Sequence, residues 1–291
     1  MSTFAYTKET DMNYTVLNNG VKMPSLGYGV FQIDPKDTER CVLDALSVGY
    51  RSIDTAQIYG NEAGVGEAIS KAGIARKDLF ITTKIWISNF GYEKAKASID
   101  ESLKKLKTDY ADLFLIHQPF GDVYGAYRAL TEAYKEGKIK AIGVSNFVPD
   151  RLADLTAYNE IVPAVNQIEA HIFWQRKADM EIAKKLGVAV TAWSPFVEGK
   201  NDFFTNQVLT KIGKKYNKSV AQVGLRFLLQ KDMIVIPKSV RKERMQENFA
   251  IFDFVLTQEE ITEIERLDLN KPMVMPCPHN SVEGVEFMKG R

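Results

Sequence analysis

An aspartate and a tyrosine lie five residues apart in the stretch GYRSIDTAQIYGNEAGVG, residues 49–66. The stretch begins as a short strand-like run that ends at Asp54, turns, and presents Tyr59 just before a glycine-rich helix start. A carboxylate and a phenol at a strand-to-helix loop can hold or transfer a proton. We therefore take this stretch as the hypothetical centre of the chemistry and ask which elements position it.

Short apolar runs alternate with amphipathic helical patterns along most of the chain. Eight runs are candidate strands: residues 26–30, 51–54, 79–84, 113–117, 141–145, 164–168, 189–193 and 234–237. Eight successive βα units predict an α/β fold, a closed parallel (β/α)8 TIM barrel of about 250 residues. Two doubly wound halves are the alternative.

The ends of the chain carry their own signals. Apolar residues alternate around Asn18-Asn19-Gly20, which predicts an N-terminal β-hairpin over residues 14–24. Near the other end, Thr257 and Glu260 form a capping box that opens a last helix. We expect an irregular C-terminal tail over residues 270–291. Since no linker or repeat interrupts the pattern, we expect residues 1–291 to form a single domain.

Most candidate strands finish on a polar or titratable side chain. Such residues are Asp54, Lys84, His117, Ser145, Asn146, Gln167, Lys238 and Ser239. Barrel enzymes build their active sites at the carboxyl ends of strands, so these side chains are expected to meet at one mouth. Structural alternatives remain for each group: Asp54 and Lys84 as a buried ion pair, Tyr59 as a half-buried aromatic, and His117 as a core histidine.

A cluster of cations follows the last candidate strand in the sequence IPKSVRKERMQEN, residues 236–248. Lys238, Arg241, Lys242 and Arg244 lie within seven residues, next to a helix expected to begin near Ser239. A helix amino terminus flanked by arginines predicts a phosphate site. A solvated basic face is the alternative.

Composition excludes several classes of protein. Apolar residues make up 45% and charged residues 26%, and the formal charge of +1 leaves no footprint for nucleic acid. No secretory leader and no apolar run long enough for a membrane span occur, so a cytoplasmic protein is expected. The two cysteines, Cys41 and Cys277, predict no disulfide framework, and His117, His171 and His279 have no metal-ligand spacing. We expect no metal.

The order of the motifs GYRSIDTAQIYGNEAGVG, IGVSNF, VNQIE and IPKSVRKERMQEN resembles the aldo-keto reductase family over almost the full chain. The run GKNDFF followed by AQVGLRFLLQK is most similar to its bacterial 2,5-diketo-D-gluconic acid reductase branch. The resemblance implies a general acid at Tyr59, supported by Lys84 and Asp54. His117 would orient the substrate carbonyl.

The same resemblance implies NADPH as cofactor. Trp193 would stack under the nicotinamide, whose carboxamide would bond with Ser145, Asn146 and Gln167. Ser194 would meet the pyrophosphate. The remaining cofactor contacts implied are Lys238, Ser239, Val240, Arg244, Glu247 and Asn248.

The resemblance also implies the reaction. We expect hydride transfer from NADPH that reduces small dicarbonyl or keto-sugar carbonyls to alcohols, in a monomer whose pocket is lined by Phe31 and Trp86. Gln118 follows His117 where many relatives carry tryptophan, which makes that wall more polar. The alternatives are an alcohol dehydrogenase working in reverse and an NADPH-binding sensor subunit with little turnover.

Overall fold

Eight parallel strands form the centre of the computed structural model, which describes residues 7–9, 12–275 and 281–289. The strands are β4 (Tyr28–Gly29), β5 (Ser52–Asp54), β6 (Phe80–Ile85), β7 (Leu113–Ile116), β8 (Ile142–Ser145), β9 (Val165–Glu169), β10 (Ala189–Trp193) and β11 (Met233–Val235). Each pairs with its sequence neighbours, and a parallel bridge between Leu26 and Val235 joins the first strand to the last. The sheet therefore closes, and the predicted (β/α)8 barrel is confirmed.

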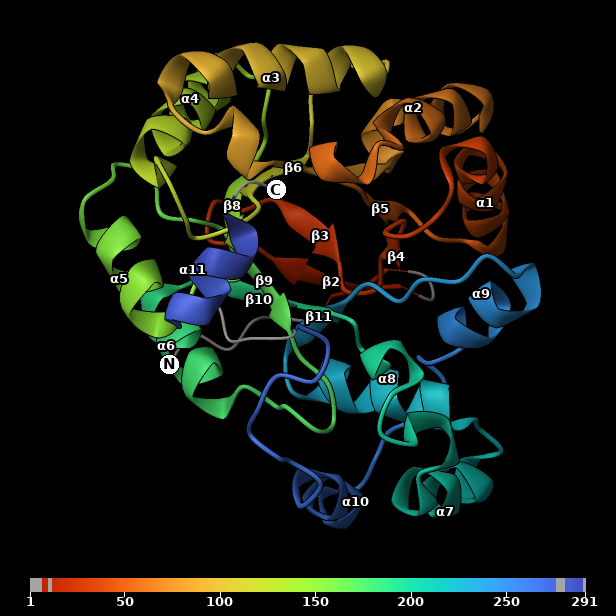
Figure 1. Cartoon of the computed structure of the whole chain (residues 1–291). Helices are drawn as coiled ribbons and strands as arrows, with labels where there is room; N and C mark the ends of the chain where they lie inside the picture. The colour runs from red at the N-terminus through yellow and green to blue at the C-terminus, as the bar shows by residue number, and fades with distance from the viewer. Residues whose placement is uncertain (1–6, 10–11, 276–280, 290–291) are drawn as a thin grey trace.

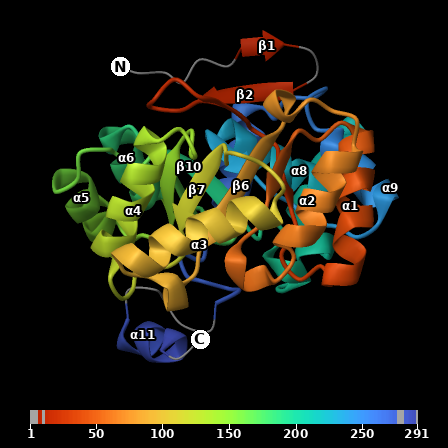
Figure 2. The ribbon, with the colours of Figure 1, turned by 90° about the horizontal axis from the view of Figure 1, so that it is seen from above.

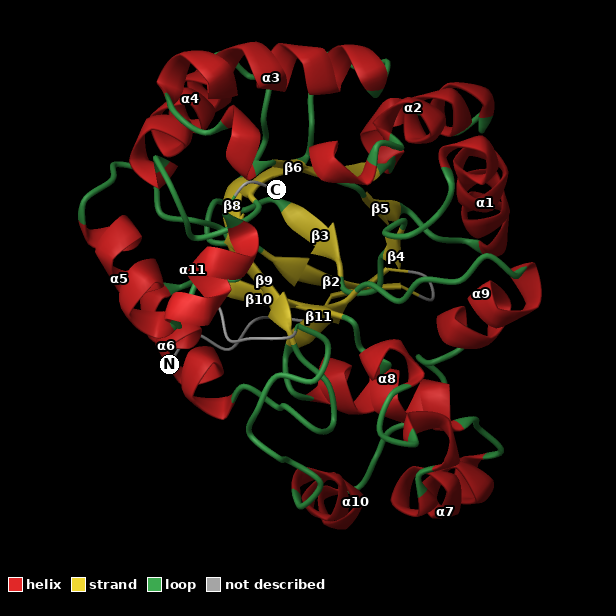
Figure 3. Ribbon diagram, in the orientation of Figure 1, coloured by secondary structure: helices red, strands yellow, loops and turns green. Residues whose placement is uncertain are grey.

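Helices surround this barrel as an outer ring (Figures 1 and 3). They are α1 (Pro35–Val48), α2 (Glu62–Lys71), α3 (Tyr92–Lys105), α4 (Val123–Lys135), α5 (Pro149–Ala157), α6 (Lys177–Leu186), α7 (Gln207–Tyr216), α8 (Val220–Gln230), α9 (Lys242–Phe249) and α10 (Gln258–Glu265). Their apolar faces and the outward side chains of the strands form the main core. The capping box of Thr257 and Glu260 is confirmed, whereas α9 begins at Lys242, later than the expected start near Ser239.

A small antiparallel sheet closes the amino-terminal end of the barrel. It consists of β1 (Thr7–Glu9), β2 (Met12–Val16) and β3 (Lys22–Pro24). The predicted hairpin is confirmed as β2 and β3, while β1 adds a strand that was not predicted. Leu17 and Met23 pack against the first inward-facing residues of the barrel strands, such as Phe80 and Leu113. The open mouth of the barrel is therefore at the opposite end, and Figure 2 shows β1 and α11 on opposite sides of the barrel.

The tail contains a helix, α11 (Val282–Met288), so the prediction of an entirely irregular tail is wrong. The Ser281 side chain accepts a hydrogen bond from the Gly284 amide and caps this helix, and Gly284 and Met288 are both buried. Two residues of one buried face four positions apart are a weak signal in so short a segment. Cys277 and His279 lie outside the described residues, and Cys41 is a buried free thiol.

The interior of the barrel changes from apolar to polar along each strand. Because side chains alternate between the two faces of a strand, Phe80, Thr82 and Lys84 succeed one another on the inward face of β6. Phe80 belongs to the apolar cluster at the closed end, and Lys84 lies at the other end with no exposed surface. The polar strand ends are thus gathered at the open mouth, above an apolar floor.

Two glycines of the 49–66 stretch serve helix packing. A Cβ atom on Gly64 would lie 2.8 Å from the Thr38 side chain of α1, and one on Gly66 would lie 2.2 Å from the carbonyl oxygen of Lys105. These glycines let α2 approach α1 and the end of α3, its neighbours in Figure 1. Their role is packing, which agrees with the poor match to a dinucleotide fingerprint in the sequence.

We predict that Gly66→Ala lowers the free energy of unfolding by about 1–3 kcal/mol, because the added methyl group meets the main chain of the next helix. Urea denaturation followed by circular dichroism measures the change. Ser70→Ala, on an exposed position of the same helix, is the control and should leave stability within about 0.5 kcal/mol. Equal stability of the Gly66 variant and the wild type would contradict the close approach.

Candidate active site

Lys84 is the centre of the polar mouth. Its ammonium group lies 2.5 Å from Oδ1 of Asp54 and donates to the Thr55 carbonyl at 2.8 Å and to the Tyr59 hydroxyl at 3.2 Å. An ammonium has three protons to donate, and these three partners satisfy all of them. Asp54 and Lys84 therefore form a buried ion pair, as the structural alternative had it, and the same pair also reaches the Tyr59 phenol.

Tyr59 is held by the turn that follows β5. A short 3-10 helix, η1 (Gln57–Tyr59), carries it, and Gly60 adopts a positive φ of 68° that ends the turn. The buried side chain of Asn61 accepts from the Thr55 hydroxyl and donates to the carbonyl of Val30. These bonds tie the loop to the neighbouring strand end and fix where the phenol points.

Burial raises the pKa of the Tyr59 phenol above its ordinary value, although the nearby Lys84 ammonium lowers it and Asp54 raises it further. A neighbouring cation alone would lower the pKa of a phenol, but here desolvation of the phenolate outweighs the Lys84 cation. Burial also acts to lower the pKa of Lys84. The charge interactions and hydrogen bonds with Asp54 and Tyr59 raise it by more, so the pKa of Lys84 is raised overall. The group at the mouth is a neutral phenol next to a permanent cation.

Aromatic rings pack around the Tyr59 ring on the cavity side. The His117 ring packs edge-on against Tyr59 and Trp86, at centroid distances of 5.7 and 5.0 Å. Phe31 stands 4.9 Å from the Tyr59 ring and is half exposed. All four rings line one cavity, so the predicted catalytic and substrate-wall residues are brought together.

The amide side chains predicted to contact a cofactor form a second connected group. Gln167 donates to the free oxygen of Asp54 at 2.7 Å, and Ser145 donates to the main chain of Gln167. Asn146, at a positive φ of 64°, accepts from the indole N–H of Trp193 at 2.9 Å. Asp54 therefore couples the Lys84 site to this amide wall through Gln167.

A cavity of about 860 Å³ opens over these groups. Trp193 and Ser194 form part of its wall and Lys238 stands at its edge, while Val274, Met275, Phe287 and Met288 from the tail cover another part. A space of this size lined by both amide and aromatic groups suits a cofactor together with a small substrate.

The cation cluster lies beyond this cavity, after β11. Lys238, Arg241 and Arg244 are exposed, and no ion pair joins them to an acidic group in the part of the chain that the structure describes. Lys242 has Asp44 at 3.7 Å. Of the remaining predicted cofactor contacts, only Lys238 borders the cavity. The others stand in the adjoining loop and in α9: Ser239, Val240, Arg244, Glu247 and Asn248.

Several site residues were missed by sequence reasoning. Gln57 accepts from the Trp86 amide and donates to Ser102 of α3, so it braces the loop that carries Tyr59. Val274 and Met275 line the cavity from the tail. A glutamine two residues before a tyrosine and an aliphatic pair in a tail carry no distinctive pattern, so no local signal marks them.

Neither a metal site nor a membrane-spanning helix is found among the described residues. No group of three histidine, cysteine, aspartate or glutamate side chains there is arranged to hold a metal ion. Among the described helices, none combines the length and apolar character that crossing a membrane requires.

Comparison with known proteins places the whole barrel in one family. The Aldo/keto reductase family matches residues 20–269. The glyoxal reductase of Bacillus subtilis is 47% identical over 262 residues, which cover 89% of this chain and 94% of the relative.

Two solved structures extend the comparison. The Bombyx mori aldo-keto reductase in complex with NADP is 33% identical with a TM-score of 0.85, covering 90% of this chain and 95% of that one. A structure named, provisionally, as a 2,5-diketo-D-gluconic acid reductase B is 40% identical with a TM-score of 0.88, covering 94% and 98%. The protein belongs to the aldo/keto reductase family.

Proposed function

We propose that this protein is an NADPH-dependent reductase that converts small dicarbonyl or keto-sugar compounds to alcohols, with Tyr59 as the proton donor. One observation carries the proposal: the buried Lys84 ammonium holds the Tyr59 hydroxyl at 3.2 Å, in the wall of a cavity that His117 also lines. The named relatives, a glyoxal reductase and an NADP complex among them, support it.

The residues present fit a phosphorylated dinucleotide. Exposed Lys238, Arg241 and Arg244 have no acidic partner among the described residues, so they are available to a phosphate group. Ser145, Asn146 and Gln167 offer amide and hydroxyl groups to a carboxamide, and Trp193 offers a ring face. When bound, NADPH supplies the hydride.

The chain itself must polarise the carbonyl and deliver a proton. His117 stands where it can hydrogen-bond to the substrate oxygen, and Tyr59 gives its proton to that oxygen as negative charge develops there. Lys84 stabilises the phenolate that remains, and Asp54 holds Lys84 in place. The raised pKa of Tyr59 keeps the phenol protonated, and hence able to donate, in the free site.

The polar part of the cavity wall favours small carbonyl substrates that carry a second oxygen. Gln118 is buried, lines the cavity and lies 3.4 Å from Asn146, so this wall is polar. The indole N–H of Trp86 is buried and has no hydrogen-bond partner among the described residues. The polar Gln118 side chain of this wall can hydrogen-bond to the second oxygen of a dicarbonyl or to a sugar hydroxyl.

We further infer a cytoplasmic monomer that acts as a single domain. Support comes from the ordinary charge balance and from the sparse cysteines. The alternative of a sensor subunit gains no support from the relatives named above.

We predict that Tyr59→Phe lowers kcat for carbonyl reduction by about 10²–10⁴-fold, since it removes the proton donor. NADPH oxidation with methylglyoxal, an aromatic aldehyde and a keto-sugar gives the rates, and fluorescence titration gives NADPH affinity, which should be preserved. Tyr158→Phe, at a highly exposed tyrosine, is the control. Tight NADPH binding without Tyr59-dependent turnover on any carbonyl would favour the sensor.

The raised pKa of Tyr59 also predicts a pH profile. An acid works while it is protonated, so kcat/KM should stay level from about pH 7.5 to 9.5 and fall only above the ordinary tyrosine value of about 10. Steady-state reduction at saturating NADPH, in buffers of constant ionic strength, measures this. A decline centred at neutral pH that persists in a His117→Asn variant would argue against Tyr59 as the donor.

We predict that Arg244→Ala lowers kcat/KM for NADPH by about 10- to 100-fold, the effect of losing a charged hydrogen bond to phosphate, and leaves NADH almost unchanged. The ratio of the two cofactors is the measurement. Arg128→Ala, at an exposed arginine of α4, should leave the ratio as in the wild type. Equal use of both cofactors by the wild type would refute the phosphate site.

A further inference from the structure

A tail segment crosses the mouth of the barrel next to the cavity. Val274 and Met275 line the cavity directly, and both are half-buried. The main chain of this segment, residues 273–275, is bound by one carboxylate. Glu169 accepts from the amide of Met273 at 2.7 Å, of Val274 at 2.9 Å and of Met275 at 3.5 Å. A side chain more than a hundred positions away thus holds this wall.

Glu169 belongs to the same strand end as the cofactor-facing amides. It follows Gln167 by two positions on β9, so the two side chains share one face of the strand, and it pairs with Trp193 of β10. Gln167 reaches Asp54, whereas Glu169 reaches the tail. One strand end therefore connects the chemistry at the floor of the site with the tail wall above it.

The carboxylate of Glu169 is buried and hydrogen-bonded on several sides. It is only 2% exposed, and His171, which is fully buried, lies with Nε2 3.1 Å from Oε1. Burial works to raise the pKa of Glu169, but the bonds from His171 and from the Met273 and Val274 amides outweigh it, so the pKa is lowered. The group is a buried anion whose oxygens accept from the His171 ring and from main-chain amides of the tail.

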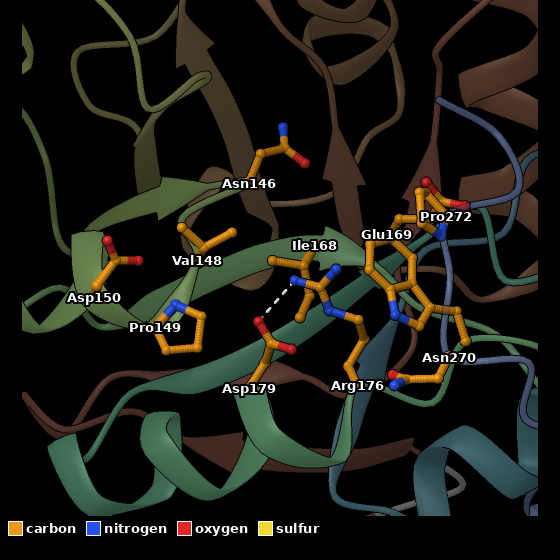
Figure 4. A pocket seen from close by; sticks show the side chains of 11 residues that line it. Asn146, Val148, Pro149, Asp150, Ile168, Glu169, Arg176, Asp179, Asn270 and Pro272 are labelled. Carbon is orange, nitrogen blue, oxygen red and sulfur yellow. Dashed lines mark hydrogen bonds and ion pairs between the residues drawn. The ribbon is translucent and has the colours of Figure 1, made fainter. Parts of the chain in front are cut away.

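The stretch of tail just before this segment lies over a second cavity. A space of about 340 Å³ is bordered by Asn270 and Pro272 of the tail and by Asn146 and Ile168 of the barrel (Figure 4). Figure 4 also shows Glu169 next to Pro272 at its edge. Close packing does not fill this space, whereas Met273 and Val274 of the next stretch pack against the apolar core. The bonds to Glu169 add a polar anchor to that packing.

A cation contacts the other side of the same peptides. The Lys200 ammonium, from the loop after β10, lies 3.4 Å from the carbonyl oxygens of Met273 and of Val274. Lys200 is about half exposed, so water can replace it. The buried carboxylate is therefore the stronger of the two contacts.

We propose that Glu169 is a positioning residue that fixes residues 273–275 across the mouth and thereby sets the apolar wall for bulky carbonyl substrates. This inference rests on the proposed carbonyl reduction. A small dicarbonyl reaches Tyr59 and His117 without filling the cavity, whereas a large aromatic aldehyde must also contact Val274 and Met275. Loss of the Glu169 bonds should therefore penalise the large substrate selectively.

The test compares Glu169→Ala and Glu169→Gln with the wild type, using methylglyoxal and 2-naphthaldehyde. Three unpaired amides in the alanine variant should raise KM for 2-naphthaldehyde about tenfold, while kcat for methylglyoxal and NADPH affinity stay within about twofold. The glutamine variant keeps one acceptor oxygen and should show a smaller rise, a partial rescue. Glu181→Gln, at an exposed glutamate of α6, is the matched control.

Two further measurements isolate the tail. Hydrogen exchange at the amides of residues 273–275 should accelerate in both Glu169 variants. Met275→Ala should raise KM for 2-naphthaldehyde by itself, and its combination with Glu169→Ala should be less than additive because both changes damage one wall.

The outcomes separate the two proposals. Unchanged amide exchange and unchanged KM for 2-naphthaldehyde in the alanine variant would overturn the anchoring role, whatever the kcat values for the two substrates. An equal fall in kcat for both substrates, or weakened NADPH binding, would also overturn it, because Glu169 would then act through the catalytic or cofactor groups. If the wild type reduces no carbonyl, the proposed function fails, and amide exchange still decides whether Glu169 holds the tail. Should the alanine variant not fold, the isosteric glutamine variant carries the same comparison.

Discussion

A buried ammonium group constrains everything at the mouth of this barrel. Lys84 has no exposed surface, and a charge taken out of water must be compensated by a counter-ion and by acceptors for each of its protons. Asp54, the Thr55 carbonyl and the Tyr59 hydroxyl meet that requirement. The position of the phenol therefore follows from the need to satisfy Lys84, and a turn locked by Asn61 and Gly60 delivers it there.

The barrel can hold such a charge because its interior is apolar at the closed end and polar at the open mouth. The closed end is plugged by the hairpin residues Leu17 and Met23 over an apolar layer, which keeps water out from below. The charged side chains Asp54 and Lys84 stand at the last inward positions of β5 and β6, near the cavity. After β11, the exposed cations Lys238, Arg241 and Arg244 lie close together in the sequence and have no acidic partner among the described residues, so an anionic ligand is attracted there.

The site is formed partly by the ends of the barrel strands and partly by the C-terminal tail. The groups proposed to hold and transfer a proton stand on strand ends or on a braced turn, where small displacements are costly. The wall that a substrate meets comes partly from the tail, which reaches the barrel through hydrogen bonds to Glu169 at the edge of a cavity. Substrate range can therefore change in the tail without disturbing the Lys84 group.

The sequence by itself determined the barrel and the residues at its mouth, because eight βα units leave few topologies and parallel strands bring Asp54, Lys84 and His117 to one end. Tertiary structure decided what no local pattern records. Gln57 and Glu169 act through partners about 30 and 100 positions away, and such contacts have no period or motif. It also decided the sign of the Tyr59 pKa shift, because that sign depends on how far burial outweighs Lys84, and burial is a property of the packed chain.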